Sequence, residues 1–64
     1  GHIETALATL SPRERSVLVL RYYNDLKLSE IAETLSISDG AVKSHLFKAT
    51  RKMRKRLAFL VKSK

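Results

Sequence analysis

The chain of 64 residues is short enough for one domain only, and its 44% hydrophobic and 30% charged residues are typical of a folded globular protein. It has no cysteine and no cluster of metal-binding residue types, so we expect no disulfide, metal or other cofactor. No apolar run approaches the roughly 20 residues of a membrane span, so we expect a cytoplasmic protein with no membrane partner. We interpret residues 1–2 as a tag scar, residues 3–61 as the domain and residues 62–64 as a basic tail.

Charge is distributed unevenly along the chain. Residues 1–39 carry four basic and six acidic residues, a net of −2, whereas residues 40–64 carry nine basic residues and no acidic one, a net of +9. One strongly electropositive end is typical of a protein that binds a polyanion. Repulsion among so many positive charges is a cost that a purely structural surface need not carry. A solvated helix face is the alternative interpretation.

Two helices are predicted in the N-terminal half. Apolar residues at i, i+3, i+4 and i+7 predict a short amphipathic helix over residues 3–10. A second helix is predicted over residues 12–23, because Ser11 is a favourable N-cap, Pro12 suits the first helical position and Glu14 can complete a capping box. The apolar run at residues 17–20 covers more than one face of this helix, which is therefore either central in the core or exposes an apolar strip to a partner.

Two further helices are predicted in the C-terminal half. A short one spans residues 28–35, where four apolar residues have helical spacing, and a polar break over residues 24–27 precedes it. Ser38 is the expected N-cap of the last helix, with Asp39 in its first turn. Beyond Gly40 the apolar residues recur every three or four positions as far as Val61, which predicts one helix of about 22 residues and roughly 33 Å.

A short helix, a turn of about three residues and a basic helix form the helix-turn-helix plan. Ala32 is small where the two helices would cross, Ile37 would fill the turn, and Val42 and Leu46 would pack the second helix on the first. We therefore predict an all-α fold, a small four-helix domain containing a helix-turn-helix with a long basic C-terminal recognition helix.

The stretch from residue 10 to residue 57 resembles region 4 of bacterial RNA polymerase sigma factors, most closely the extracytoplasmic-function type. The residues that carry the resemblance are LSPRER at 10–15, LRYY at 20–23, EIAE at 30–33 and GAVKS at 40–44. The resemblance implies a promoter-recognition domain of an alternative sigma factor that acts at the bacterial nucleoid. The implied partners of this monomeric domain are double-stranded promoter DNA, the β flap of the RNA polymerase core, and an anti-sigma factor.

The resemblance also assigns site residues. Four residues of the last helix would face base edges in the major groove, where lysine can donate to guanine, serine can donate or accept, and phenylalanine can contact the thymine methyl group: Lys43, Ser44, Phe47 and Lys48. The candidate phosphate contacts are Lys27, Ser38, His45, Arg51 and Lys52. The chain departs from the family pattern at four positions, since Lys27 replaces a capping Ser or Thr, Ser36 replaces a turn glycine, and His45 and Lys48 replace arginine.

Two other interpretations stay open. The effector domain of a response regulator shares LSPRE, EIA and the VK.H pattern, but it usually has a glycine in the break before the third helix and lacks LRYY. Alternatively, the domain is chiefly a protein-interaction module that binds an anti-sigma factor or a polymerase through Val19 and Tyr23. We do not expect an enzyme, because the sequence has no paired carboxylates in an apolar setting, no nucleophile–base pair and no glycine-rich phosphate loop.

Overall fold

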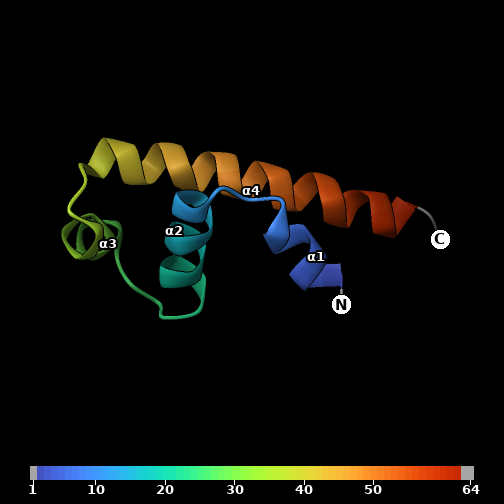
Figure 1. Cartoon of the computed structure of the whole chain (residues 1–64), viewed down its shortest axis with the longest axis horizontal. Helices are drawn as coiled ribbons and strands as arrows, with labels where there is room; N and C mark the ends of the chain where they lie inside the picture. Colours follow the sequence, from blue (N-terminus) through green and yellow to red (C-terminus); the bar gives the residue numbers. More distant parts are fainter. Residues whose placement is uncertain (1, 63–64) are drawn as a thin grey trace.

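Four α-helices follow one another in the computed structural model, which describes the backbone of residues 2–62 and the side chains of residues 4–58. They are α1 (His2–Ala8), α2 (Pro12–Tyr22), α3 (Leu28–Leu35) and α4 (Asp39–Lys62). No strand occurs between residues 2 and 62, so the predicted all-α fold is confirmed. The long helix α4 runs along one side of the molecule, and α3, α2 and α1 lie beneath it in that order along its length (Figure 1).

Helix α2 begins where its predicted capping box places it. The Ser11 side-chain oxygen accepts a hydrogen bond from the Glu14 backbone N–H at 3.2 Å, and the Glu14 carboxylate accepts one from the Ser11 N–H at 3.0 Å. Pro12 occupies the first turn, where its missing N–H costs no helical hydrogen bond. The predicted start of α2 is therefore confirmed.

Helix α2 ends in a break whose conformation was not predicted. Asp25 lies in the left-handed region with φ 56°, which a short polar side chain tolerates better than most residues do. The guanidinium of Arg21 donates to the backbone oxygen of Leu26 at 2.8 Å and so holds the break against the end of α2. This bond joins the helix to the segment that leads into α3.

Helix α3 starts without a side-chain cap from Lys27, because lysine has no acceptor atom. The carboxylate of Glu30 nevertheless accepts a hydrogen bond from the Lys27 backbone N–H at 2.7 Å, which supplies the returning half of a capping box. Helix α3 thus starts without the capping side chain that is common in the family, and Glu30 replaces part of its effect.

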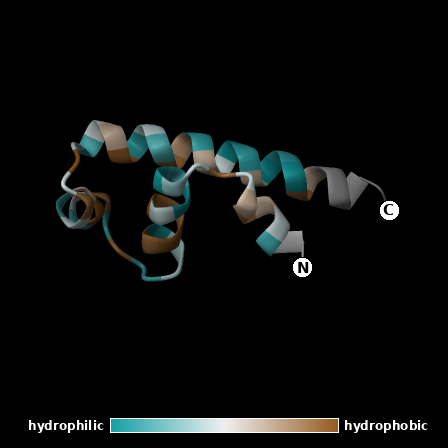
Figure 2. Ribbon diagram, viewed as in Figure 1, coloured by the Kyte–Doolittle hydropathy of each residue, from teal (hydrophilic) through white to brown (hydrophobic). Residues whose placement is uncertain are grey.

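The core consists of two apolar clusters that share helices α2 and α4. The first cluster contains Val17, Ile31, Ala32 and Val42, and the second contains three residues from α2, α4 and the segment before α2: Leu10, Leu18 and Ala49. Helices α2 and α4 each contribute to both clusters, so the core lies chiefly between these two helices. The hydropathy colouring shows the apolar surface of α2 and α3 turned toward the interior (Figure 2).

Candidate nucleic-acid interface

The turn between α3 and α4 has two backbone hydrogen bonds that define its shape. Ser36 adopts φ 56° and ψ 45°, the Ile37 N–H donates to the Ala32 oxygen at 3.0 Å, and the Ser36 N–H donates to the Glu33 oxygen at 3.3 Å. This is a Schellman motif, in which the residue after the left-handed one packs back on the helix. Ile37 packs against the first core cluster, so its predicted role as the apolar plug of the turn is confirmed.

Helix α4 begins after a cap supplied by Ser38. The Ser38 side-chain oxygen accepts a hydrogen bond from the Ala41 N–H at 3.0 Å, which confirms the predicted N-cap. The hydroxyl accepts in this bond, and its own hydrogen is still available to an acceptor such as a phosphate. A Cβ atom added at Gly40 would meet only Ser38 Oγ, at 3.9 Å, so the fold itself does not require a glycine there.

One side of α4 is buried and the opposite side is open to solvent. Val42 and Ala49 are fully buried against α2 and α3, and Leu46 packs between them against both core clusters. On the opposite side lie the four predicted base-contacting residues, all exposed, together with Arg51: Lys43, Ser44, Phe47 and Lys48. Phe47 is 65% exposed, so its aromatic ring is accessible to solvent on a face that also carries basic side chains.

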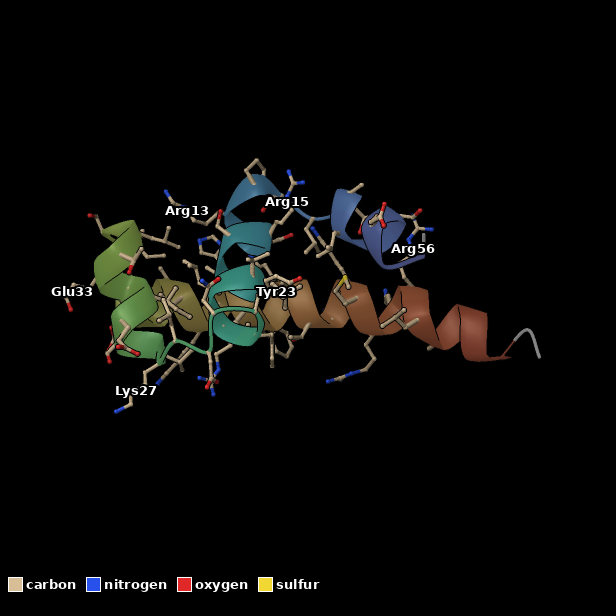
Figure 3. All side chains as sticks on the ribbon, turned by 90° about the horizontal axis from the view of Figure 1, so that it is seen from below. Arg13, Arg15, Tyr23, Lys27, Glu33 and Arg56 are labelled. Carbon is tan, nitrogen blue, oxygen red and sulfur yellow. The ribbon has the colours of Figure 1, made fainter. Side chains whose placement is uncertain are left out.

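The predicted phosphate contacts are not gathered in one place. Ser38, His45 and Arg51 belong to the start and the first half of α4, where Arg51 is exposed and His45 is half-buried. Lys27 is exposed at the other end of α3 and projects outward from its start (Figure 3). These assignments remain predictions, because solvent exposure alone does not identify a contact with DNA.

Lys52 has a protein partner that the sequence did not reveal. Its ammonium lies 2.7 Å from the carboxylate oxygen Oε1 of Glu14, a residue that is only 6% exposed. The hydrogen bond from Lys52, followed by the backbone hydrogen bond from Ser11, lowers the pKa of Glu14 below its ordinary value and outweighs the opposing effect of burial. One available signal was the spacing of Glu14 to Val17 and Leu18, which places all three residues on the buried side of α2.

An exposed apolar groove lies on another side of the domain, between α1, α2 and α4. It has a volume of about 790 Å³ and is lined mainly by apolar and aromatic side chains: Leu7, Leu18, Val19, Tyr22, Tyr23, Met53 and Leu57. Val19 is 37% exposed and Tyr23 is 90% exposed, so the two predicted partner-binding residues share one surface. Helix α2 is thus both central in the core and exposed along one strip.

Neither a metal-binding cluster nor a membrane-spanning helix is found in the part of the chain that the structure describes. No group of three or more His, Cys, Asp or Glu residues comes together there in a way that could hold a metal ion. None of the helices, as far as they are described, combines the length and the apolar character needed to cross a bilayer.

A short helix, a closed turn and a long helix with an exposed basic face together define a helix-turn-helix domain of the DNA-binding class. The model of the family described as sigma-70, region 4 matches residues 6–55 of this chain. The chain therefore belongs to the sigma-70 region 4 family, a DNA-binding regulatory domain rather than a known enzyme.

Curated relatives agree with this assignment. The chain is 41% identical over 51 residues to the RNA polymerase sigma-E factor of Streptomyces coelicolor, covering 80% of this chain and 29% of that protein. It is 42% identical over 52 residues to the ECF RNA polymerase sigma factor SigL of Mycobacterium tuberculosis, covering 81% and 29%. It is 38% identical over 52 residues to the RNA polymerase sigma factor SigV of Bacillus subtilis, covering 81% and 31%. The chain thus spans less than a third of these relatives.

These comparisons confirm the predicted resemblance to region 4 of extracytoplasmic-function sigma factors. They do not favour the alternative that the chain is the effector domain of a response regulator.

Proposed function

We propose that this chain is the promoter-recognition domain of an alternative sigma factor and that it directs RNA polymerase to promoters in the bacterial cytoplasm. In this proposal α4 enters the major groove of the upstream (minus thirty-five) promoter element. The observation that carries the proposal is the outward face of α4 from Lys43 to Arg51, which is exposed and basic. This face follows directly after the hydrogen-bonded turn between α3 and α4. A helix about 10–12 Å across fits a major groove about 12 Å wide.

The proposed division of labour follows the chemistry of the exposed side chains. Lys43 and Lys48 would donate to guanine O6 or N7, Ser44 would donate or accept, and Phe47 would contact a thymine methyl group. The ring of Phe47 is 65% exposed, so it is accessible to a thymine methyl group in the groove. Arg51 is one turn further along the same face, where it would meet the phosphate backbone.

The remaining phosphate candidates have weaker structural support. The Ser38 hydroxyl can donate to a phosphate while it caps α4, and His45 is partly accessible on the same helix. Lys27 would reach DNA only where the duplex extends past the start of α3. Lys52 would have to leave Glu14 or share its ammonium protons with that carboxylate.

The first experiment is selection of bound duplexes from a random pool at two salt concentrations. A guanine-containing consensus that persists at the higher salt concentration would support direct base reading, because phosphate contacts weaken steeply with salt whereas base contacts determine sequence. Recovery of duplexes with no consensus at either salt concentration would contradict the proposal.

Comparison of Lys43→Ala with Arg51→Ala tests the proposed roles. Lys43→Ala should weaken binding to the consensus by roughly 1–3 kcal/mol and relax base preference at one position. Arg51→Ala should weaken binding to all sequences alike and reduce the slope of log affinity against log salt by about 0.9. Fluorescence anisotropy titrations at several salt concentrations measure both effects. A sequence-selective loss for Arg51→Ala would overturn the assignment.

A second candidate function is protein binding, which is compatible with DNA binding. The apolar groove beside Tyr23 suits an amphipathic helix, and we infer that the β flap of RNA polymerase or an anti-sigma factor occupies it. Val19→Glu should abolish binding to a purified β-flap fragment and to an anti-sigma factor, because it places a charge in an apolar surface, and it should leave DNA binding intact. Ser29→Glu, on α3 outside the groove, controls for the added charge. Unchanged affinity of Val19→Glu for both partners would reject this candidate function.

A further inference from the structure

The packing between α4 and the rest of the domain is largely apolar. Val42, Ala49 and Leu46 bury surface against α2 and α3, but apolar contacts are non-directional, so they define the rotation of a helix about its own axis less sharply than a hydrogen bond does. The hydrogen bond from Lys52 to Glu14 is different, because it joins two defined atoms across 38 positions of sequence at 2.7 Å. It is therefore a directional link between α4 and α2.

The Glu14 end of this link is held rigidly. The same carboxylate oxygen that accepts from Lys52 also accepts from the Ser11 backbone N–H at 3.0 Å, within the capping box of α2. Glu14 is 6% exposed, so little water reaches its carboxylate to compete for these hydrogen bonds. Lys52 is thus bound to a fixed point at the start of α2.

We propose that the Glu14–Lys52 ion pair locks the rotation of α4 and that Lys52 is a positioning residue for base reading, not a phosphate contact. This inference rests on the proposed function and refines it. Side chains on the outer face lie roughly 6 Å from the helix axis, so a rotation of 10° moves them by about 1 Å. A binding constellation needs its groups within about 0.5 Å and 10–20° of the productive geometry. Loss of the link would therefore misplace Lys43 and Lys48.

Arg51 is the matched comparison for Lys52. The two cations are neighbours in sequence and both are exposed, Lys52 with 44% of its side chain, but Arg51 lies on the outer face and makes no ion pair in the described part of the chain. If both residues contacted phosphates, removing either charge would reduce the salt dependence of binding by a similar amount. Under the lock proposal only Arg51→Met reduces it.

Glu14→Gln separates the two roles of Lys52 by the sign of its effect. Glutamine still accepts the Ser11 N–H, but its neutral oxygen lacks the charge that attracts the Lys52 ammonium, so the link is weakened; the chain also gains one net positive charge. If Lys52 contacted phosphate, removal of its competing carboxylate would raise DNA affinity. Under the lock proposal the affinity for the selected consensus duplex falls roughly threefold to tenfold, which corresponds to one base contact weakened but not removed.

The experiment measures affinities of the 64-residue chain for the consensus duplex and for its single-base variants, at a temperature where circular dichroism shows each protein fully folded. The lock predicts that Glu14→Gln and Lys52→Met both lower discrimination among these duplexes, and that Lys52→Arg restores it. A merely destabilised protein would lower all affinities by one factor and leave discrimination unchanged.

Three results would overturn the lock: unchanged discrimination in Glu14→Gln, tighter binding by Glu14→Gln, or a salt slope in Lys52→Met reduced as much as in Arg51→Met. Failure of the wild-type chain to select any consensus would instead reject the proposed function, so the two failures are distinguishable.

Discussion

Ser36→Gly should stabilise the domain, because Ser36 stands in a backbone conformation that favours glycine. Its φ of 56° and ψ of 45° place it at the left-handed position of the Schellman motif that ends α3. The left-handed conformation costs an L-residue roughly 1–2 kcal/mol, which glycine avoids. Glycine loses more conformational entropy on folding, which offsets about 0.5–1 kcal/mol of this gain. The Ser36 side chain is exposed and makes no hydrogen bond among the described residues, so its loss removes no contact. The difference between these two opposing terms is a net gain of about 0.5–1 kcal/mol.

Thermal unfolding followed by circular dichroism measures this gain. For a domain of this size 1 kcal/mol shifts the midpoint by about 4–8 °C, so we expect Ser36→Gly to raise Tm by roughly 2–8 °C. Ser16→Gly is the matched control, since it makes the same chemical change at an exposed position inside α2, where it should cost about 0.5 kcal/mol. If Tm fell in both variants, the backbone of Ser36 would not be strained and the reasoning would be refuted.

Two further predictions concern the caps and the buried carboxylate. Ser38→Ala removes the acceptor for the Ala41 N–H and should cost about 1 kcal/mol in urea denaturation, whereas a loss below about 0.3 kcal/mol would contradict the capping role. The pKa of Glu14 is lowered in the folded state, so its contribution to stability is present above its ordinary value of 4.5 and is lost as pH falls through the folded pKa. The free energy of unfolding should therefore fall on acidification below about pH 4.5 more steeply in the wild type than in Glu14→Gln, and equal slopes would exclude this carboxylate as the cause.

The features that the sequence predicted correctly depend on neighbours along the chain. The capping box at Ser11 and Glu14 involves residues three positions apart, and the Ser38 cap involves a donor at the same distance. The recurrence of apolar residues beyond Gly40 identified α4 because a helix repeats every 3.6 residues. Burial of Val42 and Ala32 followed from that periodicity together with the helix-turn-helix plan. Such local rules carry most of an all-α fold.

The features that were missed depend on contacts between distant elements. Lys52 was predicted to be a phosphate contact from the resemblance, whereas its partner in the structure lies 38 positions away on α2. The groove was foreseen only through Val19 and Tyr23, since Met53 and Leu57 were assigned to the apolar stripe of α4. Helical periodicity shows on which face of its own helix each residue lies. It does not show which other helix packs against that face.

The arrangement of faces along α4 explains how one helix can take part in two kinds of contact. Its buried stripe is continuous, but the exposed base-contacting residues lie in the first half, whereas Met53 and Leu57 line the groove in the second. Phe47 and Leu57 are ten residues apart, which corresponds to roughly 15 Å along a helix. A duplex bound at the first half and a partner helix bound in the groove would therefore occupy different parts of α4. The Glu14–Lys52 ion pair lies between them, where under our proposal it would fix the rotation of both halves at once.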